Sequence, residues 1–270
     1  MFAETFSRLV SPRAAALEIA PDAAALKCSV FGDFTDERTA VAYCLAYAWS
    51  HFASFKDALH LLGLQQAEFG TNVLVVDIGC GPATALVAFG EWLYAKRGQP
   101  TSIQYIGVDR SEHMRNLAMH FAHDQGLFEP YEPMTLASTR DITADLIAQK
   151  AEACDHVVIL LSYVMHQQFM RDENVLDSII RCFAGTKRPI WVLAQDANKP
   201  QVDEANVEWW PENRLRVMLQ SSEAHGYRPR LWSRRFEAVK YSVDALGRVT
   251  QQPRTQKMGT KAIAARLLPS

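Results

Sequence analysis

Short apolar runs alternate with longer segments of helical periodicity through most of this chain. The apolar runs are too short for most helices and are typical of strands buried on both faces of a sheet. They predict strands at about residues 73–78, 103–108, 134–138, 156–161 and 190–194. Apolar residues at helical spacing predict helices at about 83–97, 112–125, 143–153, 172–183 and 207–225. This order is typical of an α/β fold with a doubly wound, mostly parallel sheet and helices on both of its faces.

The two ends of the chain do not follow this alternation. Residues 1–70 look helical, most clearly over 36–66, where apolar residues recur every three or four positions. Near the C-terminus, the segments 231–243 and 261–267 are suited to pair as antiparallel strands at the edge of the sheet. We therefore expect an N-terminal helical cap over 1–70, followed by one α/β domain over 71–270.

The composition is that of an ordinary globular protein, with 49% hydrophobic and 21% charged residues. The five cysteines contain no C-x-x-C pair, so neither a zinc site nor a disulfide framework is indicated. An odd number of unpaired cysteines is typical of a reducing compartment. The start of the chain lacks a basic segment followed by an apolar core, and no apolar run approaches about 18 residues. We therefore expect a cytoplasmic protein without a membrane partner.

The charge is unevenly distributed along the chain. The net charge is −2, yet residues 226–270 contain ten Lys or Arg and two acidic residues, a net charge of +8. The first 225 residues therefore carry −10. Such asymmetry is found in proteins that contact an anionic partner, and it also arises when exposed edge strands carry basic residues for solubility. We favour the second interpretation.

The most informative segment is 73–84, Val-Leu-Val-Val-Asp-Ile-Gly-Cys-Gly-Pro-Ala-Thr. An apolar run ends in Asp77 and then turns through Gly79 and Gly81 into a predicted helix. Glycines at the C-terminal end of a parallel strand let a ligand approach the backbone closely. The order Asp-x-Gly-x-Gly resembles the first motif of class I S-adenosylmethionine (SAM)-dependent methyltransferases. The family often has a third glycine where this chain has Ala83.

Two other interpretations of this segment stay open. A dinucleotide site of the form G-x-G-x-x-G needs a third glycine at the position of Thr84. The carboxylate of Asp77 would also repel an anionic pyrophosphate. It would attract SAM, which carries a sulfonium and an ammonium group. The remaining alternative is an ordinary strand–turn–helix connection with two turn glycines.

The resemblance implies a Rossmann-like, seven-stranded methyltransferase sheet that covers about residues 70–270 and binds SAM as its cofactor. Ligands of open α/β sheets lie beyond the carboxyl ends of the strands, so the binding residues should be strand-terminal. Asp109 ends the second strand and would accept hydrogen bonds from the ribose hydroxyl groups, unless it merely flanks a helix cap. The cofactor-binding residues that the resemblance implies are Asp77, Gly79, Gly81, Asp109, Arg110, Met114, Asp141 and Ser162.

Two of these residues have plain structural alternatives. Met114 would pack on the adenosine, but a methionine in this helix is as readily a core residue. Asp141 resembles the family acid or amide that meets the adenine amino group, and a helix cap is the competing role. Ser162, at the end of the fourth strand, would contact the methionine part of SAM through its backbone or hydroxyl group.

His166, beyond the fourth strand, is the candidate general base because imidazole titrates near neutral pH. Histidine is also common at surface and core positions, so a non-catalytic role is the alternative. Members of the family that methylate the amino group of adenine or glutamine commonly have an Asn/Asp-Pro-Pro-aromatic segment after this strand, and a Pro-Cys pair there would supply a cytosine-C5 nucleophile. Neither is present here, so the resemblance argues against these acceptors. The segment 195–198 resembles a divalent-metal site only loosely, so we expect no metal.

Three functions follow from these expectations. We favour a methyltransferase that acts on an oxygen or nitrogen of a small molecule. The basis is the combination of His166 with the polar and aromatic residues of the predicted cap, Tyr43, Tyr47 and His51. The first alternative is an RNA methyltransferase that uses the basic segment 228–240, with Trp232 stacking on a base. The second is a SAM-binding subunit that transfers no methyl group.

Overall fold

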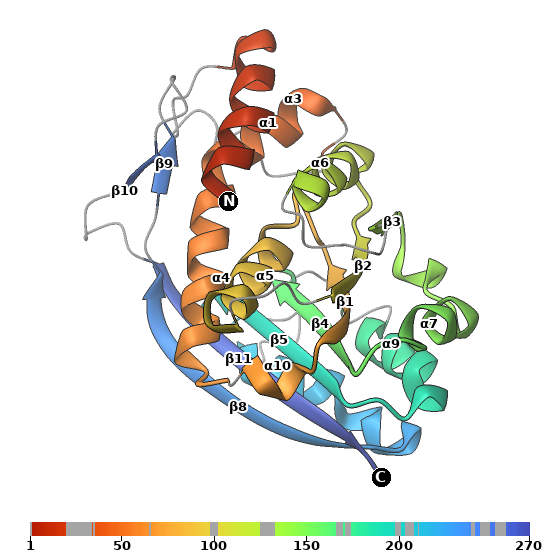
Figure 1. Ribbon diagram of the computed structural model, residues 1–270. Helices are drawn as coiled ribbons and strands as arrows, with labels where there is room; N and C mark the ends of the chain where they lie inside the picture. Colours follow the sequence, from red (N-terminus) through yellow and green to blue (C-terminus); the bar gives the residue numbers. More distant parts are fainter. Residues whose placement is uncertain are drawn as a thin grey trace.

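Seven strands form the central sheet of this computed structural model (Figure 1). They are β1 (Asn72–Ile78), β2 (Ser102–Val108), β3 (Met134–Leu136), β4 (His156–Ser162), β5 (Ile190–Ala197), β8 (Tyr227–Ala238) and β11 (Met258–Pro269). Their order is β3-β2-β1-β4-β5-β11-β8. β1 to β5 run parallel to one another, whereas β11 pairs antiparallel with both β5 and β8. The structure describes residues 2–19, 34, 36–64, 66–97, 102–124, 133–165, 170, 174–197, 201–202, 208–209, 211–238, 241–243, 249–251 and 258–270.

Each face of the sheet packs against its own layer of helices, because successive side chains of a strand point to opposite faces. Val73 and Val75 of β1 belong to one core cluster, and Leu74 and Val76 belong to the other. The first layer contains α1 (Phe2–Ala16), α3 (Glu37–Tyr43), the π-helical segment η1 (Cys44–Ala48), α4 (Trp49–Leu61), α5 (Thr84–Arg97) and α6 (Glu112–Asp124). The second layer contains α7 (Ala144–Ala151), α9 (Val175–Phe183) and α10 (Pro211–Met218). The doubly wound, mostly parallel seven-stranded sheet is therefore confirmed.

The antiparallel pair near the C-terminus is confirmed as β8 and β11, but one part of the prediction is wrong. Residues 241–243 do not continue the edge strand. They form β9 (Tyr241–Val243), which pairs with β10 (Val249–Gln251) in a separate two-stranded sheet. The alternation of residue types does not distinguish these two pairings, because both are antiparallel and local to the C-terminal region.

The predicted helix 207–225 is wrong at its start. Glu208–Trp209 forms β7, which pairs with β6 (Gln201–Val202), and α10 begins only at Pro211. Proline is well suited to a first helical position, because its φ angle is already helical and its missing N–H would have no partner there. The helical stretch also changes to a 3-10 helix, η5 (Gln220–His225), after α10 ends.

The predicted N-terminal helical region is present as α1, α3, η1 and α4. Asp36 caps α3, since its side chain accepts a hydrogen bond of 2.7 Å from the N–H of Thr39. α3, η1 and α4 follow one another without a break, and π-helical turns of this kind are frequent at functional sites. Within the described part of the chain, no helix has the length and apolar character needed to cross a membrane.

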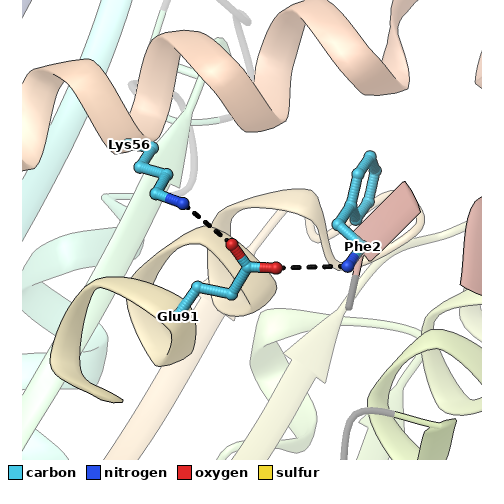
Figure 2. A network of polar contacts seen from close by, with 3 residues as sticks. All are labelled: Phe2, Lys56 and Glu91. Atoms are coloured by element: carbon cyan, nitrogen blue, oxygen red, sulfur yellow. Dashed lines mark hydrogen bonds and ion pairs between the residues drawn. The ribbon is translucent and has the colours of Figure 1, made fainter. Parts of the chain in front are cut away.

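A polar network joins α1 and α4 to α5 (Figure 2). Glu91 of α5 accepts a hydrogen bond of 3.1 Å from the backbone N–H of Phe2, and its other carboxylate oxygen lies 2.9 Å from Lys56 Nζ. The Phe2 ring stacks on Phe52 of α4 with 4.2 Å between ring centroids. α4 also contacts β8 and β11 (Figure 1). The N-terminal helices thus complete the first helical layer, while the domain boundary at residue 70 stays a prediction.

Candidate functional site

The loop after β1 has a left-handed backbone at three positions. Gly79, Gly81 and Ala83 have φ angles of +64°, +48° and +58°. Glycine adopts this conformation at little steric cost, whereas alanine is strained by it. A Cβ atom on Gly79 would lie 2.8 Å from Val164 Cγ2, but a Cβ on Gly81 would meet nothing within 4 Å. The loop therefore passes against the segment after β4, and position 79 requires glycine for two separate reasons.

Asp77 of β1 is a buried acid at the base of this loop. It is 1% exposed, and neither carboxylate oxygen has a partner in hydrogen-bonding geometry among the described residues. Burial raises the pKa of this carboxyl group well above its ordinary value, and the charge of Asp109 raises it further. The nearby Tyr105 side chain lowers it in part. A cationic ligand at this point would stabilise the ionised carboxylate.

Asp109 follows β2 and joins it to the glycine-rich loop. Its Oδ2 accepts a hydrogen bond of 3.0 Å from the N–H of Gly81, and its Oδ1 accepts one of 2.9 Å from the N–H of Ser111. Burial raises the pKa of this carboxyl group, and the two N–H groups lower it in part. Each carboxylate oxygen accepts more than one hydrogen bond. Asp109 thus shapes the loop, flanks the start of α6 and retains the capacity to bind hydroxyl groups.

The remaining predicted cofactor residues lie in different environments. Arg110 is exposed directly after β2. Met114 is fully buried in the first hydrophobic core, which is the alternative role named for it. Asp141 is exposed and belongs to the capping box of a short 3-10 helix, where its Oδ2 accepts a hydrogen bond of 3.1 Å from the N–H of Ser138. The contacts of these residues with SAM stay predictions.

A fully buried amide at the end of β5 organises the neighbouring strand and helix. Nε2 of Gln195 donates hydrogen bonds to Ser162 Oγ at 2.9 Å and to the backbone carbonyl of His51 at 3.3 Å. Its Oε1 accepts a hydrogen bond of 2.9 Å from Ser54 Oγ. The sequence drew attention to the segment 195–198 only as a loose likeness to a divalent-metal site and did not assign Gln195 to the cofactor site, because the apolar run that predicts this strand ends at residue 194.

Tyr163 continues the polar cluster directly after β4. Its φ angle is +55°, and its ring stacks on His51 with 4.5 Å between ring centroids. Its hydroxyl group lies 3.4 Å from Ser54 Oγ and 3.4 Å from Thr260 Oγ1 of β11. A left-handed tyrosine costs backbone energy, so the surrounding contacts must hold it in this position.

The aromatic residues of the predicted cap meet this cluster. The Tyr43 hydroxyl lies 3.1 Å from His51 Nδ1, and the Tyr47 ring lies 5.3 Å from that of Tyr43 and 5.8 Å from that of His51, between ring centroids. Burial raises the pKa of Tyr43 far above its ordinary value, and the charges of Asp109 and Tyr163 add to this effect. Tyr43 therefore joins this cluster through His51, whose ring stacks on Tyr163 after β4.

His166 lies outside the described residues. In the described ranges, no group of three or more His, Cys, Asp or Glu residues is arranged to hold a metal ion. Asp196, from the loosely metal-like segment, lies 4.0 Å from Arg214 Nη1, and both side chains are buried.

Burial raises the pKa of the Cys44 thiol to about 12 and that of Cys154 to about 11, which disfavours a thiolate nucleophile.

No family model and no curated protein matches this chain. It is similar to the solved structure of phosphoethanolamine N-methyltransferase 2 from Haemonchus contortus with phosphomonomethylethanolamine and S-adenosylhomocysteine, at 10% identity over 91% of this chain and 61% of that chain, with a TM-score of 0.47. It is also similar to N-methyltransferase NodS from Bradyrhizobium japonicum WM9, at 11% identity over 80% of this chain and 97% of that chain, with a TM-score of 0.41. A third similar structure is geranyl diphosphate methyltransferase in complex with SAM, at 14% identity over 91% of this chain and 95% of that chain, with a TM-score of 0.40. At these identities the likeness concerns the fold alone, a Rossmann-like sheet whose strand order is established by the pairings described above.

Proposed function

We propose that this chain is a SAM-dependent methyltransferase that acts on an oxygen or nitrogen atom of a small molecule. The observation that carries the proposal is Asp77, a buried carboxyl group whose two oxygens have no partner in hydrogen-bonding geometry in the described part of the chain, although the Tyr105 side chain is near enough to lower its pKa in part. It lies beneath a glycine-rich loop at the carboxyl end of a parallel strand, where α/β sheets bind their ligands. A buried acid in this place suits a ligand that is both adenosine-bearing and cationic.

The charge of the site favours SAM over a dinucleotide. Burial raises the pKa of Asp77, and the negative charge of Asp109 raises it further. The pyrophosphate of a nicotinamide or flavin dinucleotide would add negative charge to this pair. The sulfonium and ammonium groups of SAM would instead compensate it.

Several residues are in place to hold such a ligand. Asp109 supplies carboxylate oxygens at the end of β2, and the loop at Gly79 and Gly81 supplies backbone without side chains. We assign Arg110, Met114, Asp141 and Ser162 to the same site as proposed cofactor contacts. SAM, when bound, supplies a methyl group activated by the sulfonium. The protein's part is to orient the acceptor and to exclude water.

The choice of a small acceptor is supported by the cluster at the N-terminal end of α4. Tyr43, Tyr47, His51 and Tyr163 place four rings against one another beside the ends of β4 and β5. A cluster of rings with polar tips is suited to enclose one small planar or polar molecule. His166, from the segment after β4, stays a candidate for the general base and lies outside the described residues.

RNA is the second candidate acceptor, because Arg228, Arg230, Arg234 and Arg235 are exposed along β8. Trp232 does not support it. The Trp232 indole N–H donates a hydrogen bond of 3.4 Å to the carbonyl of Leu62, and its ring packs edge-on against Trp191. This side chain is therefore already engaged within the fold instead of offering a stacking face for a base.

Calorimetric titration with SAM, S-adenosylhomocysteine and NAD tests the cofactor assignment. We expect both adenosyl compounds to bind, NAD to show no binding, and Asp77→Asn to weaken SAM binding while the exposed control Asp145→Asn leaves it unchanged. Binding of NAD without binding of S-adenosylhomocysteine would overturn the proposal.

Incubation with methyl-labelled SAM and fractionated cell extract tests the acceptor class. We expect label in the small-molecule fraction. Label in RNA would establish the second candidate instead. SAM binding without label in any fraction would identify a binding subunit that transfers no methyl group.

A further inference from the structure

His51 is the histidine that the described structure holds most firmly at the site. Its backbone carbonyl accepts hydrogen bonds from Gln195 Nε2 at 3.3 Å and from Ser54 Oγ at 3.2 Å. Gln195 is fully buried and also bonds to Ser162 at the end of β4. The start of α4 is thereby attached to the carboxyl ends of two sheet strands, on the same face of the sheet as Asp77.

The His51 ring is fixed from three directions. Nδ1 lies 3.1 Å from the Tyr43 hydroxyl. The Tyr163 ring stacks on one face of the imidazole with 4.5 Å between ring centroids, and the Tyr47 ring lies 5.8 Å away, also between centroids. A group held in this way is pre-organised for proton transfer, which depends on heavy-atom distances near 3 Å.

Tyr43 is suited to keep one imidazole nitrogen occupied. Its phenol stays protonated because burial and the charge of Asp109 raise its pKa. A neutral phenol either donates its O–H to Nδ1 or accepts a hydrogen bond from Nδ1–H, depending on the tautomer of His51. In the tautomer with Nδ1–H, Nε2 of His51 carries the lone pair of a base.

We propose that His51 is a catalytic residue of this enzyme and that Tyr43 is its positioning residue. Nε2 of His51 takes the proton of an acceptor O–H or N–H group. The lone pair of that acceptor atom forms the new bond to the methyl carbon, and the carbon–sulfur bond breaks with its electron pair remaining on sulfur. The products are the methylated acceptor, S-adenosylhomocysteine and an imidazolium that later releases its proton to water. This inference rests on the proposed function.

The position of Tyr43 connects this base to the cofactor residues. Burial raises the pKa of the Tyr43 phenol, and Asp109 at the end of β2 and Tyr163 after β4 raise it further. In the described part of the chain, Tyr43, Tyr47 and Tyr163 lie against the His51 ring, and the charges of Asp109 and Asp196 add to the burial that raises the pKa values of Tyr43 and Tyr163. A sulfonium bound beside Asp77 and Asp109 would therefore act electrostatically on the imidazole.

Histidine NMR on the full chain tests this relationship without an identified acceptor. The ring signals of His51 are titrated in complexes with SAM and with S-adenosylhomocysteine, and His51→Gln assigns them. Because SAM carries one more positive charge, we expect the His51 pKa to be lower with SAM by about half a unit or more, which is the effect of one added unit charge nearby at intermediate dielectric constant. The exposed His60 of the same helix should show no difference.

Label transfer gives the second measurement. In the extract fraction that the wild-type protein labels, we expect His51→Gln to lower the rate at least 100-fold at neutral pH and to change its pH profile. We expect Tyr43→Phe, which keeps the ring packing, to lower the rate about tenfold and to shift that profile, while His60→Gln has no effect. Affinity for S-adenosylhomocysteine should change less than twofold in all three variants.

The outcomes separate this inference from the proposed function. If neither adenosyl compound binds the wild-type protein, both proposals are overturned. If both bind and the His51 pKa is the same in the two complexes, or if His51→Gln keeps the wild-type rate and pH profile, the role of His51 alone is overturned.

Discussion

Val164 covers Gly79 so closely that a methyl group at position 79 would lie 2.8 Å from Val164 Cγ2. The glycine belongs to the loop after β1, and the valine belongs to the segment after β4. These two segments form adjacent walls of the candidate site, because β1 and β4 are neighbouring parallel strands. The absence of a side chain at position 79 is thus a requirement of the packing.

Gly79→Ala tests this packing against its own control, Gly81→Ala. Both positions have positive φ angles, so each substitution carries a backbone cost of about 1–2 kcal/mol. Only Gly79→Ala adds a steric conflict, because nothing lies within 4 Å of a Cβ at position 81. We expect Gly79→Ala to lower the free energy of unfolding by at least about 1 kcal/mol more than Gly81→Ala, as measured by urea denaturation.

The double variant Gly79→Ala/Val164→Ala separates the two costs. Shortening Val164 removes the atom that a Cβ at position 79 would meet, so the double variant should lose less than the sum of the two single changes. Strict additivity of the two substitutions would contradict the contact.

Ala83→Gly should make the protein more stable. Ala83 has a φ angle of +58°, where alanine is strained and glycine is not. Part of the gain is lost because glycine makes the unfolded chain more flexible, so we expect an increase of about 0.5–1 kcal/mol in the free energy of unfolding. The matched control Ala88→Gly, within α5, should instead lower it by about 1 kcal/mol, because glycine is a poor helix former. A loss of stability in Ala83→Gly would contradict the backbone strain at this position.

The buried carboxyl of Asp77 predicts a pH dependence of stability. Its pKa in the folded protein lies above the ordinary value of 3.8. Between these two pKa values the unfolded chain has released a proton that the folded protein retains, so the free energy of unfolding falls as pH rises. Below the ordinary value both states are protonated and the effect is absent.

Asp77→Asn removes this ionisation. The free energy of unfolding of the variant, relative to that of the wild type, should rise as pH increases from about 4 to the raised pKa of Asp77. Above that pKa, the difference between the two proteins should stay constant. Thermal unfolding at a series of pH values measures this difference. The affinity of the wild-type protein for SAM should rise with pH over the same range, because a cation favours the ionised acid, and the variant should lack that contribution. A difference in stability that stays constant with pH would contradict the raised pKa.

Gln195→Ala should destabilise the protein strongly. The substitution leaves Ser54 Oγ and the carbonyl of His51 without their amide partner, and it removes the donor to Ser162. Losing hydrogen bonds of buried groups costs about 1–3 kcal/mol for each group left unsatisfied, so we expect a loss of at least about 2 kcal/mol in chemical denaturation. Gln220→Ala, at an exposed position, is the control and should change stability by less than about 0.5 kcal/mol.

Charge reversal on β8 tests the RNA alternative. If the acceptor were RNA, Arg234→Glu/Arg235→Glu would weaken RNA binding and reduce its dependence on salt concentration. We expect instead that the wild-type protein binds RNA weakly, and that label transfer is equal in this variant and in the control Arg8→Glu/Arg216→Glu, which has the same change in net charge. Filter binding at several salt concentrations measures both proteins. Strong, salt-dependent RNA binding lost only in the β8 variant would favour RNA as the acceptor.

The sequence by itself determined the sheet and the position of the glycine-rich loop. β1, β2, β4 and β5 each begin within one residue of the predicted start, because strands buried on both faces require continuous apolar runs that a local pattern reveals. The same local pattern placed Asp77 and Asp109 near the ends of adjacent strands. It did not distinguish whether residues 241–243 pair with β11 or with β10, since strand pairing depends on partners elsewhere in the chain.

Only the tertiary structure decided which polar residues meet at the site. Ser54 and Gln195 are 141 positions apart in the chain, and Ser54 and Tyr163 are 109 apart, so no local periodicity relates them. Their contacts arise because α4 packs on the sheet with its first turns over the ends of β4 and β5. The burial of Met114 in the core was decided in the same way. The local sequence determines which helix or strand each segment can form, but hydrogen bonds between buried side chains depend on how those segments pack.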